Sequence, residues 1–526
     1  MKNFLRRYLS LIIALIIVSS VCCLFAGRKE GLFIDEAYTY GLSNSYYAPY
    51  VYDIKDKDMI DKVISHEELL DYMTVGEDDA FAFCSVYYNQ SMDVHPPLYY
   101  WLFNFASSLH RGVMDFKAGL ILNYVIYILT LVFLYKLAFI LFNSRDIAVS
   151  AVVLYGLSVI GLSTMLMIRM YVLLTLETVL LAYFIALNMR ERKTRYCIAA
   201  GITVFAGLMT QYYFVFYAFF VCLSYLIFAL AKKDIRGTLV FSVSALLGVI
   251  ALVVAFPPFI KQLTADALVS GGSAVENAKN TAMYMTRLSG FRADCTHRMK
   301  AIIFTALAFL ALCIVFCKKI AVSAREGKLS FTSLIVIIPA FVTFAVVSIV
   351  SPVNELRYVY NIIPLFALAV CFLMYLADVS AGEFRKSRFI KKGVLLLVTA
   401  LALWEARCLP PDYLYDEYSD YDALLKPHTG SPCVYFDNNY NSPLTYDMMQ
   451  IMLFDEIFVT NDTASSAMLD YIGDADEMVT FIDISKDWAS GYDSKEILDG
   501  LMQNTDFTTA TQLYSNGFSD VYLLEK

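Results

Sequence analysis

The sequence predicts an all-α polytopic membrane protein of about eleven transmembrane helices, with outer juxtamembrane helices and a small C-terminal α/β domain. Apolar residues make up 59% of the 526-residue chain and the mean hydropathy is +0.57, whereas a soluble domain is roughly 45–50% apolar. Charged residues make up only 17% of the chain, and they cluster between long apolar runs. This pattern is typical of a chain that crosses a membrane many times.

The charges are distributed unevenly along the chain. Residues 408–526 hold 22 acidic and 4 basic side chains, a charge of −18, so the rest carries +10 of the net −8. We therefore expect a basic membrane domain at 1–407 and an acidic domain at 408–526. Nothing in this balance favours nucleic-acid binding, which requires a basic face.

Short cytoplasmic loops are rich in Lys and Arg, so the basic clusters set the orientation. These clusters lie at 2–7, 136–145, 190–195, 232–236, 318–325 and 385–392. The predicted crossings that connect them are 9–26, 116–142, two within 147–188, two within 196–230, 237–256, 299–317, 331–350, 359–376 and 393–404. The N-terminus is then cytoplasmic and the acidic domain extracytoplasmic.

One further apolar segment, 95–109, decides the parity of this topology. If it crossed the membrane, every later basic cluster would move outside. We therefore place it as a helix at the outer surface, with Pro96 in its first turn. The long outer loops are then 28–110, which includes a helical pattern at 58–73, and 257–297.

The acidic domain alternates short strands with helices, which predicts a small α/β fold. The expected strands are 433–436, 456–460, 478–482 and 520–524. The expected helices are 444–453, 464–471 and 495–502.

The polar motifs of the apolar part all fall on the predicted outer side. They are Asp35-Glu36, His95-Pro96-Pro97-Leu98-Tyr99, Arg169-Met170-Tyr171, Gln211-Tyr212-Tyr213 and Glu355-Leu356-Arg357-Tyr358. Chemistry on one side of the membrane indicates an enzyme with an extracytoplasmic site. A transporter or flippase, the alternative, typically carries polar groups at mid-depth and internal repeats.

Each motif has a functional interpretation and an alternative in which its residues are only structural or solvated. Asp35 has apolar neighbours on both sides and is a candidate general base, with Glu36 as a supporting or ligand group; the alternative is a solvated loop. His95 is a candidate hydrogen-bond donor to a phosphate group, or a candidate metal ligand.

The basic motifs are open to the same two interpretations. Arg169 and Arg357, beside Tyr171 and Tyr358, suit a lipid phosphate; the alternatives are a snorkelling side chain and an ordinary loop. Further candidates for substrate contact, with packing as the alternative, are Gln211 and Tyr99.

At these motifs the chain resembles the C-type membrane glycosyltransferases, in particular bacterial relatives of protein O-mannosyltransferases and aminoarabinose transferases in glycosyltransferase family 39 and its kin. That family has an Asp-Glu pair after the first span, then a His-Pro-Pro-Leu-Tyr-type motif, an Arg-x-Tyr and a late Arg-Tyr. The resemblance covers roughly residues 1–400.

The resemblance implies an inverting transfer of a sugar from a polyprenyl-phosphate donor at the outer face of a bacterial plasma membrane. The loop aspartate would activate a hydroxyl of a glycan, lipid or protein acceptor, and the basic groups would stabilise the departing phosphate. The chain departs from the family at Gln211, where many relatives have His, and has no second acid near Arg169. No cofactor is therefore certain, and a divalent cation stays open.

Overall fold

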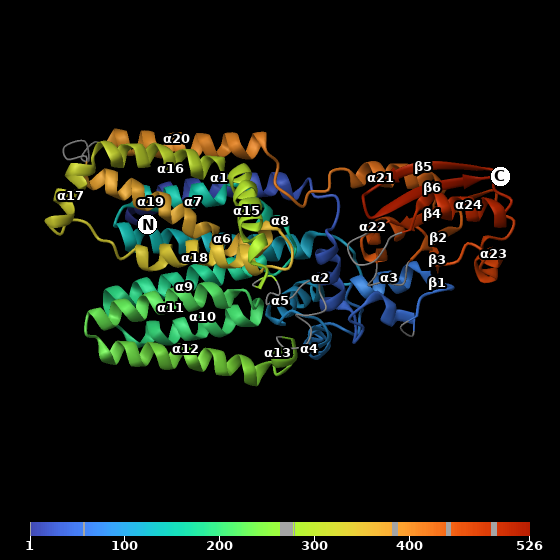
Figure 1. The fold of residues 1–526 in the computed structure, drawn as a ribbon, viewed down its shortest axis with the longest axis horizontal. Helices are drawn as coiled ribbons and strands as arrows, with labels where there is room; N and C mark the ends of the chain where they lie inside the picture. Colours follow the sequence, from blue (N-terminus) through green and yellow to red (C-terminus); the bar gives the residue numbers. More distant parts are fainter. Residues whose placement is uncertain are drawn as a thin grey trace. The chain divides into compact units, whose positions relative to one another are not determined.

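The computed structural model describes residues 2–55, 58–262, 277, 279–380, 388–437, 443–484 and 492–526. The chain forms two compact units, each assembled from distant segments (Figure 1). The helical unit consists of Met1–Gly27, Val94–Tyr99 and Leu120–Asp412. The sheet unit consists of Arg28–Asp93, Tyr100–Gly119 and Tyr413–Lys526.

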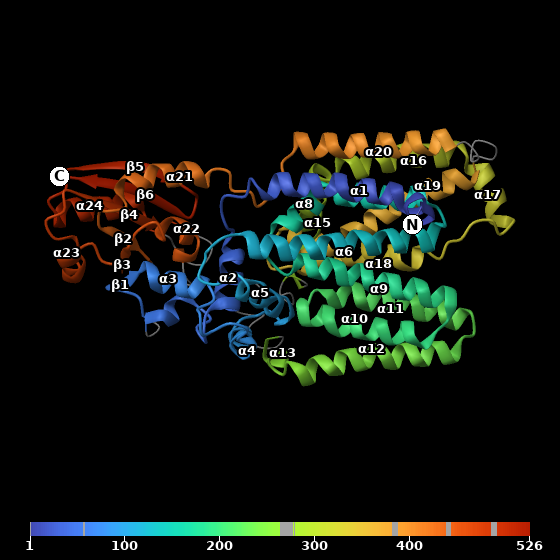
Figure 2. The same cartoon turned by 180° about the vertical axis from the view of Figure 1, so that it is seen from behind.

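Long helices that run side by side build the helical unit (Figures 1 and 2). Its helices are α1 (Lys2–Ala26), α6 (Lys117–Phe142), α7 (Arg145–Gly156), α8 (Val159–Leu166), α9 (Tyr171–Glu191), α10 (Thr194–Thr210), α11 (Phe214–Ala231), α12 (Ile235–Ala255), α13 (Pro258–Lys261), η3 (Thr281–Met283), α15 (Tyr284–Arg298), α16 (Lys300–Val315), α17 (Cys317–Arg325), α18 (Leu334–Val350), η4 (Leu356–Ile362), α19 (Ile363–Ser380) and α20 (Arg388–Cys408).

Helices α10 and α12 approach each other through glycine. A Cβ atom at Gly248 would clash with the carbonyl oxygen of Gly201, and a Cβ atom at Gly201 would clash with the backbone of Ser244. Small residues at such a contact let two apolar helices pack backbone to backbone, which is the usual basis of helix association in a membrane.

The predicted crossings all coincide with helices, but not all of these helices qualify as spans. Among the described residues six helices are long and apolar enough to cross a membrane, or eight if the bent pairs α7–α8 (61°) and α15–α16 (91°) each count as one. Helices α10 and α18 have 17 residues each. That length is about 25 Å, less than the roughly 30 Å hydrocarbon core of a bilayer. The count of eleven therefore stays a prediction.

A six-stranded mixed sheet organises the sheet unit, in the order β1-β3-β2-β4-β6-β5. The strands are β1 (Lys62–Ser65), β2 (Cys433–Phe436), β3 (Glu456–Thr460), β4 (Glu477–Asp483), β5 (Thr509–Ser515) and β6 (Ser519–Glu525). Strands β3, β2 and β4 are parallel, whereas β1, β6 and β5 join by antiparallel pairing.

Short helices accompany this sheet. They are α2 (Ile34–Asn44), η1 (Val51–Lys55), α3 (His66–Met73), α4 (Phe83–Met92), most of α5 (Leu98–Ser108), α21 (Tyr418–Leu425), η6 (Lys426–His428), η7 (Pro443–Thr445), α22 (Met448–Ile451), α23 (Ser466–Ile472) and α24 (Ser494–Asn504).

The predicted division at 407/408 differs from the compact units. The structure groups residues 28–93 with the tail, because β1 of the first outer loop pairs with β3, Ile64 opposite Ile457. The pattern at 58–73 suggested a helix throughout, whereas the helix begins at His66 behind a Ser65 cap. Strand β5 escaped prediction because most of its side chains are exposed at the edge of the sheet.

The four strands predicted in the tail are present. The central strand, β2, is buried on both faces of the sheet. All four residues of β2 are buried. One face packs Val434, Phe436 and Phe458 against Met468 of α23 and Leu501 of α24. Continuous apolar strands of this kind are typical of parallel strands covered on both sides.

A buried carboxyl group, Asp447, sits at the start of α22. It accepts hydrogen bonds from the hydroxyls of Tyr435 at 2.9 Å and Ser519 at 2.5 Å, and from the Asn516 amide at 2.7 Å. Burial raises the pKa of Asp447 from 3.8 to about 6, against the opposing effect of these hydrogen bonds.

We predict that Asp447 makes the stability of the sheet unit depend on pH. Because its folded-state pKa lies above the unfolded value, the folded state holds an extra proton between about pH 4 and 6, and the stabilisation is lost as the pH rises through about 6. Relative to Asp447→Asn, the wild type should lose roughly 3 kcal/mol over this range. Denaturation of both proteins at several pH values measures the gap. Asp499→Asn, at an exposed position of α24, is the control. A gap that does not vary with pH would contradict the prediction.

Candidate active site

The acid pair Asp35-Glu36 forms the first turn of α2, where negative charge is favoured by the helix dipole. The two acids have different surroundings. Glu36 is completely buried, and its Oε2 accepts the backbone N–H of Phe33 at 2.7 Å, which caps the helix. Asp35 is half-buried and keeps part of its surface exposed.

A buried lysine, Lys29, neutralises Glu36. Its Nζ atom lies 3.0 Å from Oε1 and 3.0 Å from Oε2 of Glu36, and it donates to the carbonyl oxygen of Tyr413 at 2.8 Å. Neither side chain of the pair is exposed. Burial lowers the pKa of Lys29, and the neighbouring Glu36 opposes this shift. The carboxylate of Glu36 is therefore engaged by an ammonium and an amide, whereas Asp35 is the less buried acid of the pair.

Lys29 escaped the sequence analysis. It follows the first span beside Arg28 and Glu30, a pattern typical of solvated loop charges. The signal that could have identified it is its spacing: Lys29 precedes Glu36 by seven residues across an apolar Leu32-Phe33-Ile34 run, which can bury both charges together.

In the helical unit, tyrosine rings gather around the second Arg-Tyr motif. Tyr171 begins α9, and Tyr358 and Tyr360 lie in η4. The Tyr171 ring meets Tyr358 at a centroid distance of 6.5 Å and Tyr360 at 6.3 Å, both edge to face. Tyr213, at the start of α11, meets Tyr358 at 5.3 Å. The two predicted Arg-Tyr motifs, distant in sequence, are thus joined through their tyrosines.

The arginines of these motifs are both buried. Arg357 is 8% exposed, lies 5.6 Å from the Tyr358 ring centroid and pairs with Glu355 at 2.6 Å. Arg169 is 4% exposed and lies in the turn before α9. Guanidinium groups are well suited to phosphate, which accepts several charge-assisted hydrogen bonds.

Tyr99 supports the turn that carries Arg169. It has no exposed surface, and its hydroxyl donates to Oδ1 of Asn123 at 2.8 Å. The Asn123 amide donates in turn to the carbonyl oxygens of Met165 at 3.1 Å and Met167 at 2.7 Å. Tyr99 therefore has a supporting position, and its predicted contact with substrate stays a prediction.

The remaining candidates lie at helix ends. His95 is half-buried and precedes α5. Gln211 is 4% exposed and ends α10, directly after Thr210, whose hydroxyl donates to Glu177 Oε1 at 2.9 Å. Sequence analysis did not single out Arg287 of α15, which donates to the carbonyl oxygens of Ser348 and Ser351.

Asp35 and Glu36 belong to the sheet unit, and the other predicted site residues belong to the helical unit. Within the described ranges, no group of three or more His, Cys, Asp or Glu side chains has the arrangement of a metal site. All eleven cysteines are free thiols.

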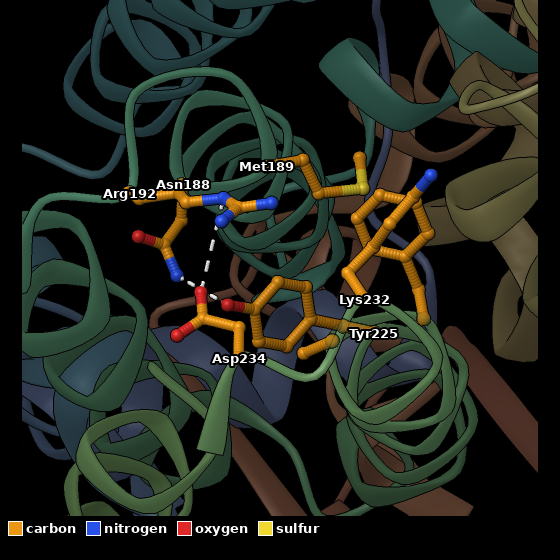
Figure 3. Close-up of a pocket in the computed structure, with 8 residues that line it drawn as sticks. Asn188, Met189, Arg192, Tyr225, Lys232 and Asp234 are labelled. Carbon is orange, nitrogen blue, oxygen red and sulfur yellow. Dashed lines mark hydrogen bonds and ion pairs between the residues drawn. The ribbon is translucent and has the colours of Figure 1, made fainter. Parts of the chain in front are cut away.

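A small pocket lies apart from all of these residues in the sequence. It is lined by Asn188, Met189, Arg192, Tyr225, Phe228, Ala229, Lys232 and Asp234 (Figure 3). Asn188 donates to the Tyr225 hydroxyl at 2.6 Å, and Arg192 lies 3.9 Å from Asp234. Because its residues lie in the predicted cytoplasmic loops or at the adjoining ends of the predicted crossings, we assign it no part in the candidate site.

Comparison with protein families identifies the class of enzyme. Residues 94–260, which include His95, Arg169 and Gln211, match a family model described as "Dolichyl-phosphate-mannose-protein mannosyltransferase". The chain is a glycosyltransferase that uses a lipid-phosphate sugar. The resemblance inferred from the motifs is thereby confirmed.

The chain is also similar in fold to solved structures. The glycosyltransferase is similar to ArnT from Cupriavidus metallidurans in the apo state, with a TM-score of 0.50 and 10% identity over 98% of this chain and 97% of that chain. ArnT bound to undecaprenyl phosphate matches over the same shares with a TM-score of 0.49 and 9% identity. AglB from Archaeoglobus fulgidus, in complex with an inhibitory peptide and a dolichol-phosphate, matches with a TM-score of 0.46 and 12% identity over 98% of this chain and 74% of that chain. No curated protein matches the chain.

The buried arginines generate a prediction for donor use. A hydrogen bond to a charged group contributes about 1.5–3 kcal/mol, so Arg169→Ala and Arg357→Ala should each weaken use of a lipid-phosphate sugar about 10- to 100-fold. Steady-state kinetics on the purified variants measures this loss. Arg192→Ala, at an exposed arginine of the same unit, is the matched control. Normal donor kinetics in both buried variants would favour the snorkelling and packing interpretations.

Proposed function

We propose that the protein is an inverting glycosyltransferase that moves a sugar from a polyprenyl-phosphate donor to an acceptor hydroxyl at the extracytoplasmic face of the membrane. The observation that carries the proposal is the difference between the two acids of α2. Glu36 is held by Lys29 and the helix N-terminus, whereas Asp35 is only half-buried and is flanked along the chain by apolar side chains. A carboxylate in such a setting suits a general base.

The reaction proceeds in one displacement. The Asp35 carboxylate takes the proton of the acceptor hydroxyl, and the acceptor oxygen forms a bond to the anomeric carbon. The bond from that carbon to the phosphate oxygen breaks at the opposite face, and its electron pair leaves with the lipid phosphate. Attack opposite to the leaving group inverts the anomeric configuration.

The proposed role of the basic residues is to stabilise the phosphate as its charge develops. Arg169 and Arg357 supply guanidinium groups, His95 a further donor, and Tyr171 and Tyr358 hydroxyl groups. Support for a polyprenyl-type phosphate comes from the dolichyl-phosphate family match over residues 94–260. Donors fixed where charge develops are the main electrostatic contribution of enzymes to such reactions.

We propose a bacterial plasma membrane as the location and an acceptor that is a glycan, a lipid or a protein. Gln211 is proposed to contact substrate from the end of α10, and Tyr99 to support the Arg169 turn. Because the chain is a glycosyltransferase by its family match, the transporter or flippase alternative is not retained.

Asp35 is predicted to be essential for turnover. Asp35→Asn keeps the shape of the side chain and removes its basicity, and general-base catalysis typically contributes about 10²–10⁴-fold. Turnover should fall by about that factor while binding of the polyprenyl-phosphate sugar survives. A single-turnover assay and a donor-binding assay on the same variant separate the two quantities. Near-normal turnover of Asp35→Asn would remove the base from the mechanism, and Asp53→Asn in the same outer loop is the control.

The predicted orientation is tested by labelling. Reporter groups after Ser144 and Arg192 should be protected from a membrane-impermeant reagent in intact cells, and one after Lys526 should react, because basic loops face the cytoplasm. Reaction at Ser144 and Arg192 would place the active side in the cytoplasm and overturn the extracytoplasmic assignment.

A further inference from the structure

The stretch that precedes α2 lies along the beginning of the C-terminal tail. The backbone N–H of Glu30 donates to the carbonyl oxygen of Leu414 at 2.8 Å, and the Lys29 ammonium donates to the carbonyl oxygen of Tyr413 at 2.8 Å. One residue earlier, Arg28 pairs with Asp416 at 2.6 Å. We call residues 28–31 and 413–418, joined in this way, the brace.

An aromatic stack connects the brace to the edge of the sheet. Lys29 Nζ lies 5.6 Å from the ring centroid of Tyr415. From there the rings follow one another at centroid distances of 5.1 Å to Tyr418, 5.7 Å to Tyr421 and 4.2 Å to Tyr514 of β5, the last pair stacked within 9° of parallel. The first turn of α2 thus has a continuous path of packed groups to a strand of the sheet.

The backbone of the brace is strained where it holds Lys29. Tyr413 has φ 69° and Tyr415 has φ 56°, in the left-handed region that bulky residues rarely adopt. Residues persist in such conformations when surrounding contacts determine them, and they concentrate at functional sites. Here the surrounding contacts are those to Lys29, Glu30 and the neighbouring rings.

Glycine is required at the end of the brace. A Cβ atom at Gly31 would clash with the Tyr418 ring and would lie 2.8 Å from Cβ of Tyr415. Two segments of chain distant in sequence therefore approach each other more closely than any side chain would allow.

We propose that the brace is a positioning device for Asp35, with Lys29 as its central positioning residue and the C-terminal sheet as its support. Lys29 binds the carboxylate of Glu36, the residue next to Asp35, and is itself bound by the tail. The orientation of the Asp35 carboxylate then depends on residues 413–418. This inference rests on the proposed function, in which Asp35 is the base.

The sharpest test uses two glycines of the sheet unit. Gly31→Ala forces the brace apart, whereas a Cβ atom at Gly430 meets nothing within 4 Å, so Gly430→Ala is the matched control. Misplacing a catalytic group by about 1 Å costs up to about 100-fold. Gly31→Ala should therefore lower kcat about 10- to 100-fold with the donor KM unchanged, and Gly430→Ala should behave as wild type.

Two further variants examine the charges. Lys29→Met leaves Glu36 buried without its cation and should lower kcat in the same way. Lys55→Met is its control, because the Lys55–Glu68 pair is part-exposed in the same unit. Arg28 and Asp416 are about half exposed, so folding should tolerate Arg28→Asp; this variant should lower kcat a few-fold, and adding Asp416→Arg should restore it.

The outcomes separate the inference from the function on which it rests. If Gly31→Ala and the Arg28 variant keep wild-type kcat while Asp35→Asn is inactive, the brace does not position Asp35 and the proposed function stands. If Asp35→Asn is active, the base assignment itself fails. If Lys29→Met does not fold, two results still decide whether the brace positions Asp35: the kcat of Gly31→Ala, and the rescue of Arg28→Asp by Asp416→Arg.

Discussion

The buried pair of Lys29 and Glu36 is the interaction on which the acidic end of the candidate site depends. Taking two charges out of water is expensive, and the attraction between them offsets that cost only when the geometry is good and further hydrogen bonds complete it. Here the Phe33 amide and the Tyr413 carbonyl complete it. Because the Tyr413 carbonyl completes the environment of Lys29, the start of the tail contributes to the stability of the start of α2.

This constraint explains why the two acids of the pair differ in burial and in partners. Adjacent acids on a helix point in different directions, so one can face the interior while the other faces outward. Glu36 satisfies the helix N-terminus and a buried cation, and Asp35 is left half-buried beside it. The pair therefore combines a buried anchor, Glu36, with Asp35, the base of the proposed function.

The helical unit meets a related constraint in a different way. Its buried arginines cannot rely on solvent, and both lie beside helix ends in segments held by polar or aromatic contacts. Arg357 has Glu355 and Tyr358, and the turn that carries Arg169 is held through Asn123 and Tyr99. Arg169 and Arg357 thus both lie next to helix ends, in the turn before α9 and in η4 before α19.

The sequence by itself determined the helical, many-pass character, the four strands of the tail and the motifs that identify a glycosyltransferase, because hydropathy, periodicity and short motifs are local properties. Only the tertiary structure decided that β1 of the first outer loop completes the sheet, that Tyr171 meets Tyr358, and that Lys29 neutralises Glu36. The first two join residues that are far apart in the sequence. The third depends on the burial of both charges, which the polar neighbours of Lys29 did not indicate. An exposed strand edge accepts any strand of suitable register, and a buried charge accepts any opposite charge within reach, so the partner is chosen by how the whole chain packs.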